Sequence, residues 1–225
     1  MVASKTKPTR SGLYGGASPE QRQADRRRRL MDAALEIIGT DGWSQTTMRG
    51  VCERAQVGPR FIYESFENLD ALAVAVLDEI VQDTIAQVLK AVGEAPAEDL
   101  AAQVRAGAGA LIRALTDDPR RARMLFAEAH GSAPLAQGRT DAIRAIAAAL
   151  AAQSHRVLPT PTDGDPYVRA TGLLIAGGIA EMVLAWLQGD LDLTRDELSD
   201  LTAELVLVIG TGAPAIAARI RRRDA

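Results

Sequence analysis

Residues 46–72 constrain the fold more than any other stretch, because they predict two helices that are too short to be stable alone. Thr46 and Thr47 can cap a helix over about residues 48–54, and Gly58 followed by Pro59 can begin a second helix that ends at Phe66. Nucleation of a helix is costly, so an isolated helix of about two turns is unstable in water. Both segments must therefore pack against a third helix.

The segment just upstream supplies that third helix. Residues 18–21, SPEQ, have the sequence of a capping box with proline at the first helical position. Apolar residues recur at helical spacing from Leu30 to Ile38, and Gly42 is suited to end the helix. We expect a three-helix unit over residues 18–66 and a second domain over residues 67–225. The arginines at 26–29 leave two interpretations open, a solvated face or proximity to phosphates.

Helical spacing separates inward from outward side chains in the two short helices. Val51, Cys52 and Ile62 are expected inside, and Val57 is expected to fill the angle at the turn. Cys52 is interpreted as a small buried apolar side chain and not as a reactive thiol. Residues 60, 61, 63 and 64 are left outside or partly outside.

The rest of the chain also predicts helices. Asn68 opens a long helix to about residue 92, and further helices are expected over about 97–116, 119–130, 134–157, 166–188 and 194–221. Pro, Gly or Asp stands at each boundary, and no segment shows the sustained alternation of a strand. The sequence therefore predicts an all-α fold of about nine helices.

Charge is distributed unevenly along the chain. Residues 1–66 carry 11 Lys and Arg against 7 Asp and Glu, whereas residues 67–225 carry 15 against 22. A basic N-terminal third on an acidic body suggests that the front of the molecule meets a polyanion. Residues 1–17 are expected to be a disordered arm; the alternative is that Lys5, Lys7 and Arg10 touch the backbone or minor groove of DNA.

Residues 170–187 are apolar apart from Thr171 and Glu181, which raises the question of a membrane span. A span needs about 20 apolar residues, and a carboxylate at its centre costs about 2.5–3.5 kcal/mol. We therefore expect a soluble helix that is buried over most of its circumference. The start of the sequence lacks the apolar core of a secretory signal, so the protein is expected in the cytoplasm, with no membrane partner.

The sequence shows no arrangement of residues that is typical of an enzyme. Its two histidines, His130 and His155, are not spaced as metal ligands, and no glycine-rich phosphate loop follows a strand. The single cysteine excludes an intrachain disulfide and a cysteine-based metal cluster. The chain is therefore not expected to be an enzyme, and no cofactor or metal is expected.

Several short motifs follow one another from Leu30 to Leu72. They are the helix LxxAALEII, the pair Gly42-Trp43, the pair Thr46-Thr47 and the run VCERAQVGPRFIYESFENLDAL, in which Tyr63 and Phe66 are the most characteristic residues. Together they resemble the tetracycline-repressor (TetR) family of bacterial regulators. The resemblance implies an N-terminal helix-turn-helix DNA-binding domain and a helical ligand-binding and dimerisation domain. It also implies a homodimer that represses transcription from a palindromic operator and is released by a small-molecule effector, which the sequence does not identify.

Two positions depart from the pattern of that family. Gln56 stands where the family often has glycine in the turn, so either a non-glycine residue adopts a positive φ, at a cost of about 1 kcal/mol, or the turn differs. Leu69 stands where a lysine commonly begins the fourth helix. Arg49 or Arg60 can supply positive charge instead.

A helix that reads DNA needs side chains that reach base edges and flanking groups that reach phosphates. Arg60 matches O6 and N7 of guanine, and Phe61 offers an apolar surface to a thymine methyl group. Tyr63 and Thr47 suit phosphate oxygens, whereas Glu64 can accept from cytosine N4 or pair with an arginine. The DNA-binding candidates are Thr46, Thr47, Arg49, Gly58, Pro59, Arg60, Phe61, Tyr63 and Glu64.

The last two helices are the candidates for dimerisation. Their glycines cost helix stability individually, which is explained if they permit close approach of a partner helix; the alternative is that both helices only fill the core. The interface candidates are Gly172, Gly177, Gly178, Leu201, Leu205, Val208 and Ile209. Weaker candidates for a ligand pocket, for which core packing is the alternative, are Met124, Phe126, His130, Met182 and Trp186.

Two hypotheses from different classes of protein follow from the sequence. The first is a ligand-responsive transcriptional repressor. The second is an all-α enzyme or scaffold with a helix-turn-helix-like fold that does not bind DNA. A mobility-shift experiment over a salt series separates them, because only the first predicts binding that weakens steeply with salt.

Overall fold

The computed structural model describes residues 18–127, 131–154 and 165–222. Within these ranges the chain forms helices and no strand, which confirms the all-α class. The N-terminal arm, His130 and His155 lie outside the described residues. The elements are α1 (Pro19–Asp41), η1 (Trp43–Gln45), α2 (Met48–Ala55), α3 (Pro59–Ser65), α4 (Leu69–Glu94), α5 (Leu100–Thr116), α6 (Pro119–Ala122), η2 (Arg123–Ala127), α7 (Ala133–Ser154), α8 (Pro166–Gln188) and α9 (Arg195–Arg221).

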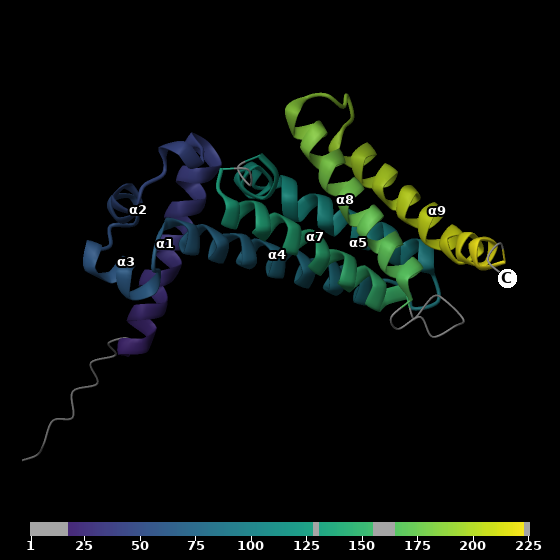
Figure 1. The fold of residues 1–225 in the computed structure, drawn as a ribbon, viewed down its shortest axis with the longest axis horizontal. Helices are drawn as coiled ribbons and strands as arrows, with labels where there is room; N and C mark the ends of the chain where they lie inside the picture. Colours follow the sequence, from purple (N-terminus) through teal and green to yellow (C-terminus); the bar gives the residue numbers. More distant parts are fainter. Residues whose placement is uncertain (1–17, 128–130, 155–164, 223–225) are drawn as a thin grey trace, which may run out of the picture.

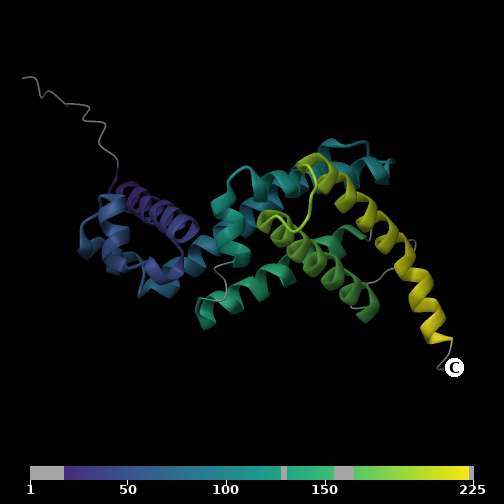
Figure 2. The ribbon, with the colours of Figure 1, turned by 90° about the horizontal axis from the view of Figure 1, so that it is seen from above.

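The helices fall into two groups that lie at opposite ends of the molecule. Figure 1 shows α1, α2 and α3, here called the head, at one end, and the bundle of α5, α7, α8 and α9, here called the body, at the other. The long helix α4 runs from the head along the body. Figure 2 shows from above that the C-terminal end of α9 is far from the head. The helix α4 therefore contacts both groups and connects them.

The head is built as its sequence requires. The hydroxyl of Ser18 accepts from the backbone N–H of Gln21, and the side chain of Gln21 accepts from the backbone N–H of Ser18, so the expected capping box is present. Gly42 ends α1 with a φ of 91°. The short helices bury Val51 and Ile62 against the apolar face of α1 that begins at Leu30. Burial of these side chains, and not helix propensity, therefore holds α2 and α3 in place.

Cys52 belongs to the same core. Its side chain is buried, as its helical spacing predicts. Burial raises the pKa of the Cys52 thiol, and the nearby Glu53 carboxylate raises it further. Because the thiolate is the reactive form, the structure confirms a packing role for this cysteine.

The turn between α2 and α3 uses a residue in the left-handed conformation. Gln56 has φ 52° and ψ 43°, so the first of the two possibilities for this position is correct. The guanidinium of Arg29 donates to the carbonyl of Gln56 at 3.0 Å and also to the carbonyl of Ala55. These bonds satisfy carbonyls that the end of α2 leaves without helical partners.

Replacing Gln56 with Gly is expected to stabilise the protein by up to about 1 kcal/mol, because only glycine adopts this conformation without strain. Urea denaturation followed by circular dichroism measures the free energy of unfolding. Gln87→Gly is the control of opposite sign, since residue 87 lies inside α4 and glycine there should cost about 1 kcal/mol. A loss of stability in Gln56→Gly would show that the side chain of Gln56 contributes more than its strained backbone costs.

The arginines at 26–29 of α1 make contacts within the head. Arg26 lies over the ring of Phe61 at 4.2 Å, and Arg27 lies over the ring of Phe66 at 4.3 Å. Arg27 also donates to the carbonyl of Ser65 at 3.2 Å. With Arg29 on the turn, at least three of these cations hold α2 and α3 against α1. Arg27, Arg28 and Arg29 are exposed, so the run is a largely solvated face whose arginines also contact α2 and α3.

Three helix boundaries in the body differ from the sequence expectations. Gly93 lies inside α4, which ends at Glu94, and α5 begins only at Leu100 because Asp99 accepts from the backbone of Ala102. The helix expected over residues 119–130 is a single short turn, α6, followed by the π-helical segment η2. Capping chemistry is local and sets the start of α5, whereas η2 is set by tertiary contacts of buried residues 124–126.

Besides its connection through α4, the head contacts the short helix α6. A Cβ atom added to Gly39 of α1 would lie 2.4 Å from Cβ of Arg120 in α6, so the two backbones can approach only because residue 39 is glycine. Arg120 is fixed by two bonds to Asp118, at 2.8 and 2.7 Å. The hydrogen bond from Arg120 lowers the pKa of Asp118 below its usual value. The junction is therefore tightly packed and charge-paired.

Replacing Gly39 with Ala is expected to destabilise the protein by about 1–3 kcal/mol, because the added methyl group forces α1 away from α6. Thermal unfolding measures the change. Gly93→Ala is the matched control: its added Cβ meets nothing within 4 Å, and alanine should raise helix stability by about 1 kcal/mol. Equal behaviour of the two variants would contradict the close approach of α1 and α6.

Candidate nucleic-acid interface and apolar cavity

The outer face of α3 is the most distinctive surface of the head. Tyr63 is 64% exposed and Phe61 36%, whereas Ile62 between them is fully buried. Gly58 and Pro59 precede these residues at the start of the helix, and both are exposed. A rigid helix thus presents side chains outward while its opposite side is anchored in the core. This is the geometry that a helix needs to enter a groove of DNA.

The charged candidates on the head are paired with neighbours on their own helices. Nε of Arg60 donates to Glu64 at 3.0 Å, and Nε of Arg49 donates to Glu53 at 2.8 Å. The arginine of each pair is almost fully exposed. Exposed pairs of this kind are weak and are readily exchanged for a stronger anion. Of the two interpretations of Glu64, the structure shows the pairing with an arginine.

The two threonines before α2 have different roles. Thr47 is exposed, and its hydroxyl caps the helix by accepting from the backbone N–H of Gly50 at 3.0 Å. Thr46 is buried, and its hydroxyl donates to the carbonyl of Gly42 at 2.9 Å. Its inclusion among the DNA-binding candidates is therefore wrong, because a buried hydroxyl that closes the turn after α1 is not available to a phosphate.

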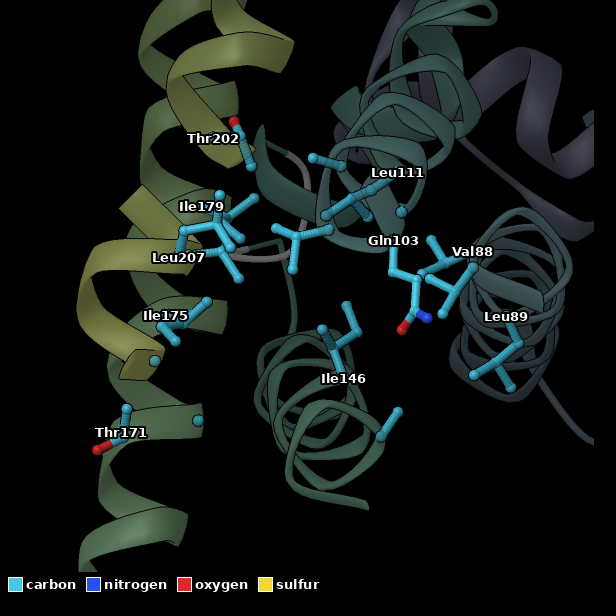
Figure 3. A pocket seen from close by; sticks show the side chains of 18 of the residues that line it. Val88, Leu89, Gln103, Leu111, Ile146, Thr171, Ile175, Ile179, Thr202 and Leu207 are labelled. Atoms are coloured by element: carbon cyan, nitrogen blue, oxygen red, sulfur yellow. The ribbon is translucent and has the colours of Figure 1, made fainter. Parts of the chain in front are cut away.

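A cavity of about 230 Å³ lies in the body. Its walls come from α4, α5, α7, α8 and α9, and Figure 3 shows Val88, Leu111, Ile146, Ile179 and Leu207 converging on it. No charged side chain occurs among the described residues that line it. Small residues of α5, Gly107 and Ala108, belong to the wall; a Cβ atom added to Gly107 would lie 3.0 Å from Cγ2 of Val92, so glycine there allows α5 to pack closely against α4.

The ligand-binding candidates chosen from the sequence do not line this cavity. Met124 is completely buried in the core, and Phe126 faces a separate cavity of about 30 Å³. Met182 packs against the core, and Nε1 of Trp186 donates to the carbonyl of Leu193 at 2.7 Å, which closes the turn between α8 and α9. His130 lies outside the described residues. The four described residues belong to the core or pack against it, and none of them lines the larger cavity.

The cavity was not predicted from the sequence, because its lining residues have the same apolar spacing as core residues. Each wall helix contributes an apolar stripe, and periodicity alone does not show whether two stripes meet or leave a gap. No residue pattern within one helix signals such a gap, because it depends on how neighbouring helices pack.

The last two helices expose an unusual amount of apolar surface. Leu201, Leu205 and Val208 form one stripe of α9 and are 40%, 42% and 68% exposed, and Leu174 of α8 is 64% exposed. Ile209 is half-buried. The expectation that the helix over residues 170–187 is buried over most of its circumference is therefore wrong for the single chain.

The glycines of α8 divide into two kinds. An added Cβ at Gly177 or Gly178 would meet nothing within 4 Å, so both lie where another helix could approach. Gly172 is buried, and a Cβ there would lie 3.0 Å from the backbone carbonyl of Ala147 in α7. Gly172 thus serves packing within the chain, and its place among the interface candidates is wrong.

By length and composition alone, α8 and α9 could each cross a membrane; the most apolar windows of the two helices are 33% and 17% buried. Core helices of soluble proteins pass the same test, and α8 and α9 pack against α7 and α5. Among the described residues, no group of His, Cys, Asp and Glu could hold a metal ion.

The exposed reading helix on an all-α scaffold defines the class of protein, a transcription regulator with a helix-turn-helix DNA-binding domain. Residues 30–76 match the family model for bacterial regulatory proteins of the tetR family. Over this segment, which includes α2, α3 and the C-terminal half of α1, the chain matches the TetR family. A comparison with curated proteins finds no sequence match.

Solved structures share the fold over most of the chain. The fatty acid degradation regulator FadR from Bacillus halodurans has a TM-score of 0.66 and 18% identity, and the match covers 85% of this chain and 96% of that one. FadR from Bacillus subtilis, solved in complex with stearoyl-CoA, has a TM-score of 0.64 and 20% identity over 80% of this chain and 96% of that one. The multidrug binding protein EbrR, complexed with imidazole, has a TM-score of 0.56 and 22% identity over 80% and 94%. At these identities the comparison establishes the fold.

Proposed function

We propose that this protein is a dimeric, ligand-responsive transcriptional repressor that binds a palindromic operator and is released by a small-molecule effector. Residues 1–17 are the arm, residues 18–66 the DNA-binding domain and residues 67–225 the domain for effector binding and dimerisation. One observation carries the proposal: α4 joins the head directly and also forms a wall of the apolar cavity. A ligand in the body and DNA at the head are therefore coupled through a single helix.

DNA recognition rests on α3 in this proposal. Arg60 exchanges Glu64 for a guanine edge, and Phe61 contacts a thymine methyl group. Tyr63 and Thr47 bind phosphate oxygens, and Arg49 supplies charge where a lysine at position 69 would have done so in relatives. Gly58 and Pro59 allow the close approach of the helix start to the groove.

The exposed apolar faces of α8 and α9 support a homodimer. Their exposed residues include a continuous stripe on α9, and charge is scarce along it. Neighbouring exposed apolar side chains on the surface of a protein often mark an interface with another chain. A second copy is the occupant we propose, because two-fold symmetry places the same stripe of both copies in contact and pairs the two heads for a palindromic site. Gly177 and Gly178 then permit close helix approach.

The same arrangement supports the cytoplasmic location that we propose. Burying α8 and α9 against a partner chain removes the apolar surface that would otherwise suit a membrane. The alternative function is an all-α enzyme or scaffold that does not bind DNA. The exposed face of α3 favours DNA binding over that alternative.

The test is a mobility-shift series on DNA upstream of the protein's own gene. If about six phosphates are neutralised by the dimer, affinity should fall by roughly a thousandfold between 50 and 200 mM salt. Footprinting should show a palindrome whose half-sites are separated by whole turns of DNA. Binding that is absent at low salt, or that does not change with salt, would contradict a DNA-binding function and leave the enzyme or scaffold alternative.

A further inference from the structure

The polar groups in the wall of the 230 Å³ cavity have a property in common. Among the described residues that line it, the polar side chains are four threonines and one glutamine. They are Thr84, Gln103, Thr171, Thr202 and Thr211. Figure 3 shows Gln103 beside Val88 and places Thr171 and Thr202 on the α8 and α9 walls. Their hydrogen bonds decide what they can offer to a ligand.

The four threonine hydroxyls have already donated their hydrogens. Each donates to the backbone carbonyl four residues earlier in its own helix, at 2.7 Å for Thr84, 2.8 Å for Thr171, 2.7 Å for Thr202 and 2.6 Å for Thr211. A hydroxyl has one hydrogen and two lone pairs, so none of these groups has a hydrogen left to donate to a ligand, and only lone pairs remain. Thr202 is completely buried and Thr84 is 2% exposed, so Thr171 and Thr211 are the more accessible of the four.

Gln103 is committed in the same way. Its Nε2 donates to the carbonyl of Pro96 at 2.9 Å and to the carbonyl of Ala97 at 2.8 Å. Both amide hydrogens are thereby used on the turn before α5, and Oε1 remains as an acceptor. The described lining of the cavity is thus mostly apolar, and its polar side chains have acceptor atoms but no uncommitted donor and no charge.

We propose that the cavity selects an uncharged, lipophilic molecule whose polar group donates a hydrogen bond, such as a phenol or an alcohol. The proposal rests on the proposed function, in which this cavity is the effector site. A carboxylate would lose its hydration without gaining a cation or a donor, which is strongly unfavourable. An acceptor-only group such as an ether would also leave its bonds to water without replacement. A phenol replaces its lost bond to water with one to a threonine or glutamine oxygen.

Isothermal titration calorimetry of the full chain at pH 8, without DNA, tests this selection. The probes have one shape and differ in the polar group: 4-pentylphenol, 4-pentylanisole, pentylbenzene and 4-pentylbenzoate. The phenol should bind about tenfold more tightly than the anisole, because one hydrogen bond is gained. The benzoate should not bind measurably. A phenol that binds no better than the anisole, or a benzoate that binds as well as the phenol, would overturn the proposal.

Variants locate the acceptor. Single changes Gln103→Leu, Thr84→Val, Thr171→Val, Thr202→Val and Thr211→Val each remove one acceptor with little change in shape. In at least one of them the advantage of the phenol over pentylbenzene should vanish, while pentylbenzene still binds and the helical circular-dichroism spectrum is kept. Gln137→Leu is the control, since Gln137 bonds Asp141 on the surface of α7. An advantage that survives in all five variants would overturn the proposal.

The failure of this inference and the failure of the proposed function have different signatures. A phenol that binds in calorimetry but does not release the operator leaves the ligand class intact and contradicts the effector role. Release of the operator by the benzoate keeps the effector role and contradicts the ligand class.

Discussion

Replacing both Arg60 and Tyr63 with Ala is expected to weaken operator binding by at least about a hundredfold while the fold is retained. A bidentate contact from arginine to guanine is worth about 1–3 kcal/mol, and each half-site of a dimer loses it together with a phosphate contact. Both side chains are exposed, so their removal takes no apolar volume from the core of the head. Mobility shift at fixed salt measures the affinity, and circular dichroism checks the helix content.

The matched control removes two exposed basic side chains from the body. Lys90→Ala with Arg105→Ala lowers the net charge by more than the Arg60 and Tyr63 pair does, yet it should leave affinity within about twofold, because both residues lie away from α3. A double variant at Arg60 and Tyr63 that binds as the unaltered protein does would remove α3 from the DNA interface.

The second large effect is expected from Leu205→Glu combined with Val208→Glu. These residues lie on the exposed stripe of α9, and neither lines the cavity. Two carboxylates per chain, facing their symmetry mates across the proposed interface, cost several kcal/mol of desolvation and repulsion. The protein should become monomeric in light scattering. Operator affinity should fall by about a hundredfold or more, because the two heads lose the effective concentration that pairing gives.

A control with the same added charge separates association from electrostatics. Gln82→Glu with Ala86→Glu places two carboxylates on the exposed side of α4 and should leave the oligomeric state unchanged. If the α9 variant remains a dimer with unchanged affinity, the interface lies elsewhere. If it is a monomer that still binds DNA as tightly as before, the dimer is not needed for operator binding.

The head shows how far local sequence rules reach. Ser18, Gly42 and Thr47 take the capping positions that their residue types favour, and these start and stop signals depend only on neighbouring residues. Local rules were insufficient for the arginines of α1. A run of cations on a helix has the same sequence whether it faces water, phosphate or the rings of Phe61 and Phe66, and only the packing of α3 against α1 distinguishes these environments.

The candidate sites divide in the same way. The exposed positions of α3 could be read from spacing, because a short helix with Ile62 buried must present its other side. Thr46 was misassigned because two adjacent threonines have equal capping propensity. Only the hydrogen bond from the hydroxyl of Thr46 to the carbonyl of Gly42, which closes the turn after α1, shows which of the two is buried. Met124 and Trp186 were misassigned because large apolar side chains mark core and pocket equally.

Sequence alone determined the all-α class, the exposed side of α3 and the match of the head to a family, since each rests on residue patterns within a few turns of helix. Tertiary structure alone decided where the cavity lies, which glycines pack inside the chain and how the head is joined to the body. These features arise where helices distant in sequence meet, and the gap that stripes from α4, α5, α7, α8 and α9 leave between them is not a property of any one stripe. Within residues 46–72, the spacing of residues predicts two short helices. The core beneath those helices fixes which side of α3 is exposed.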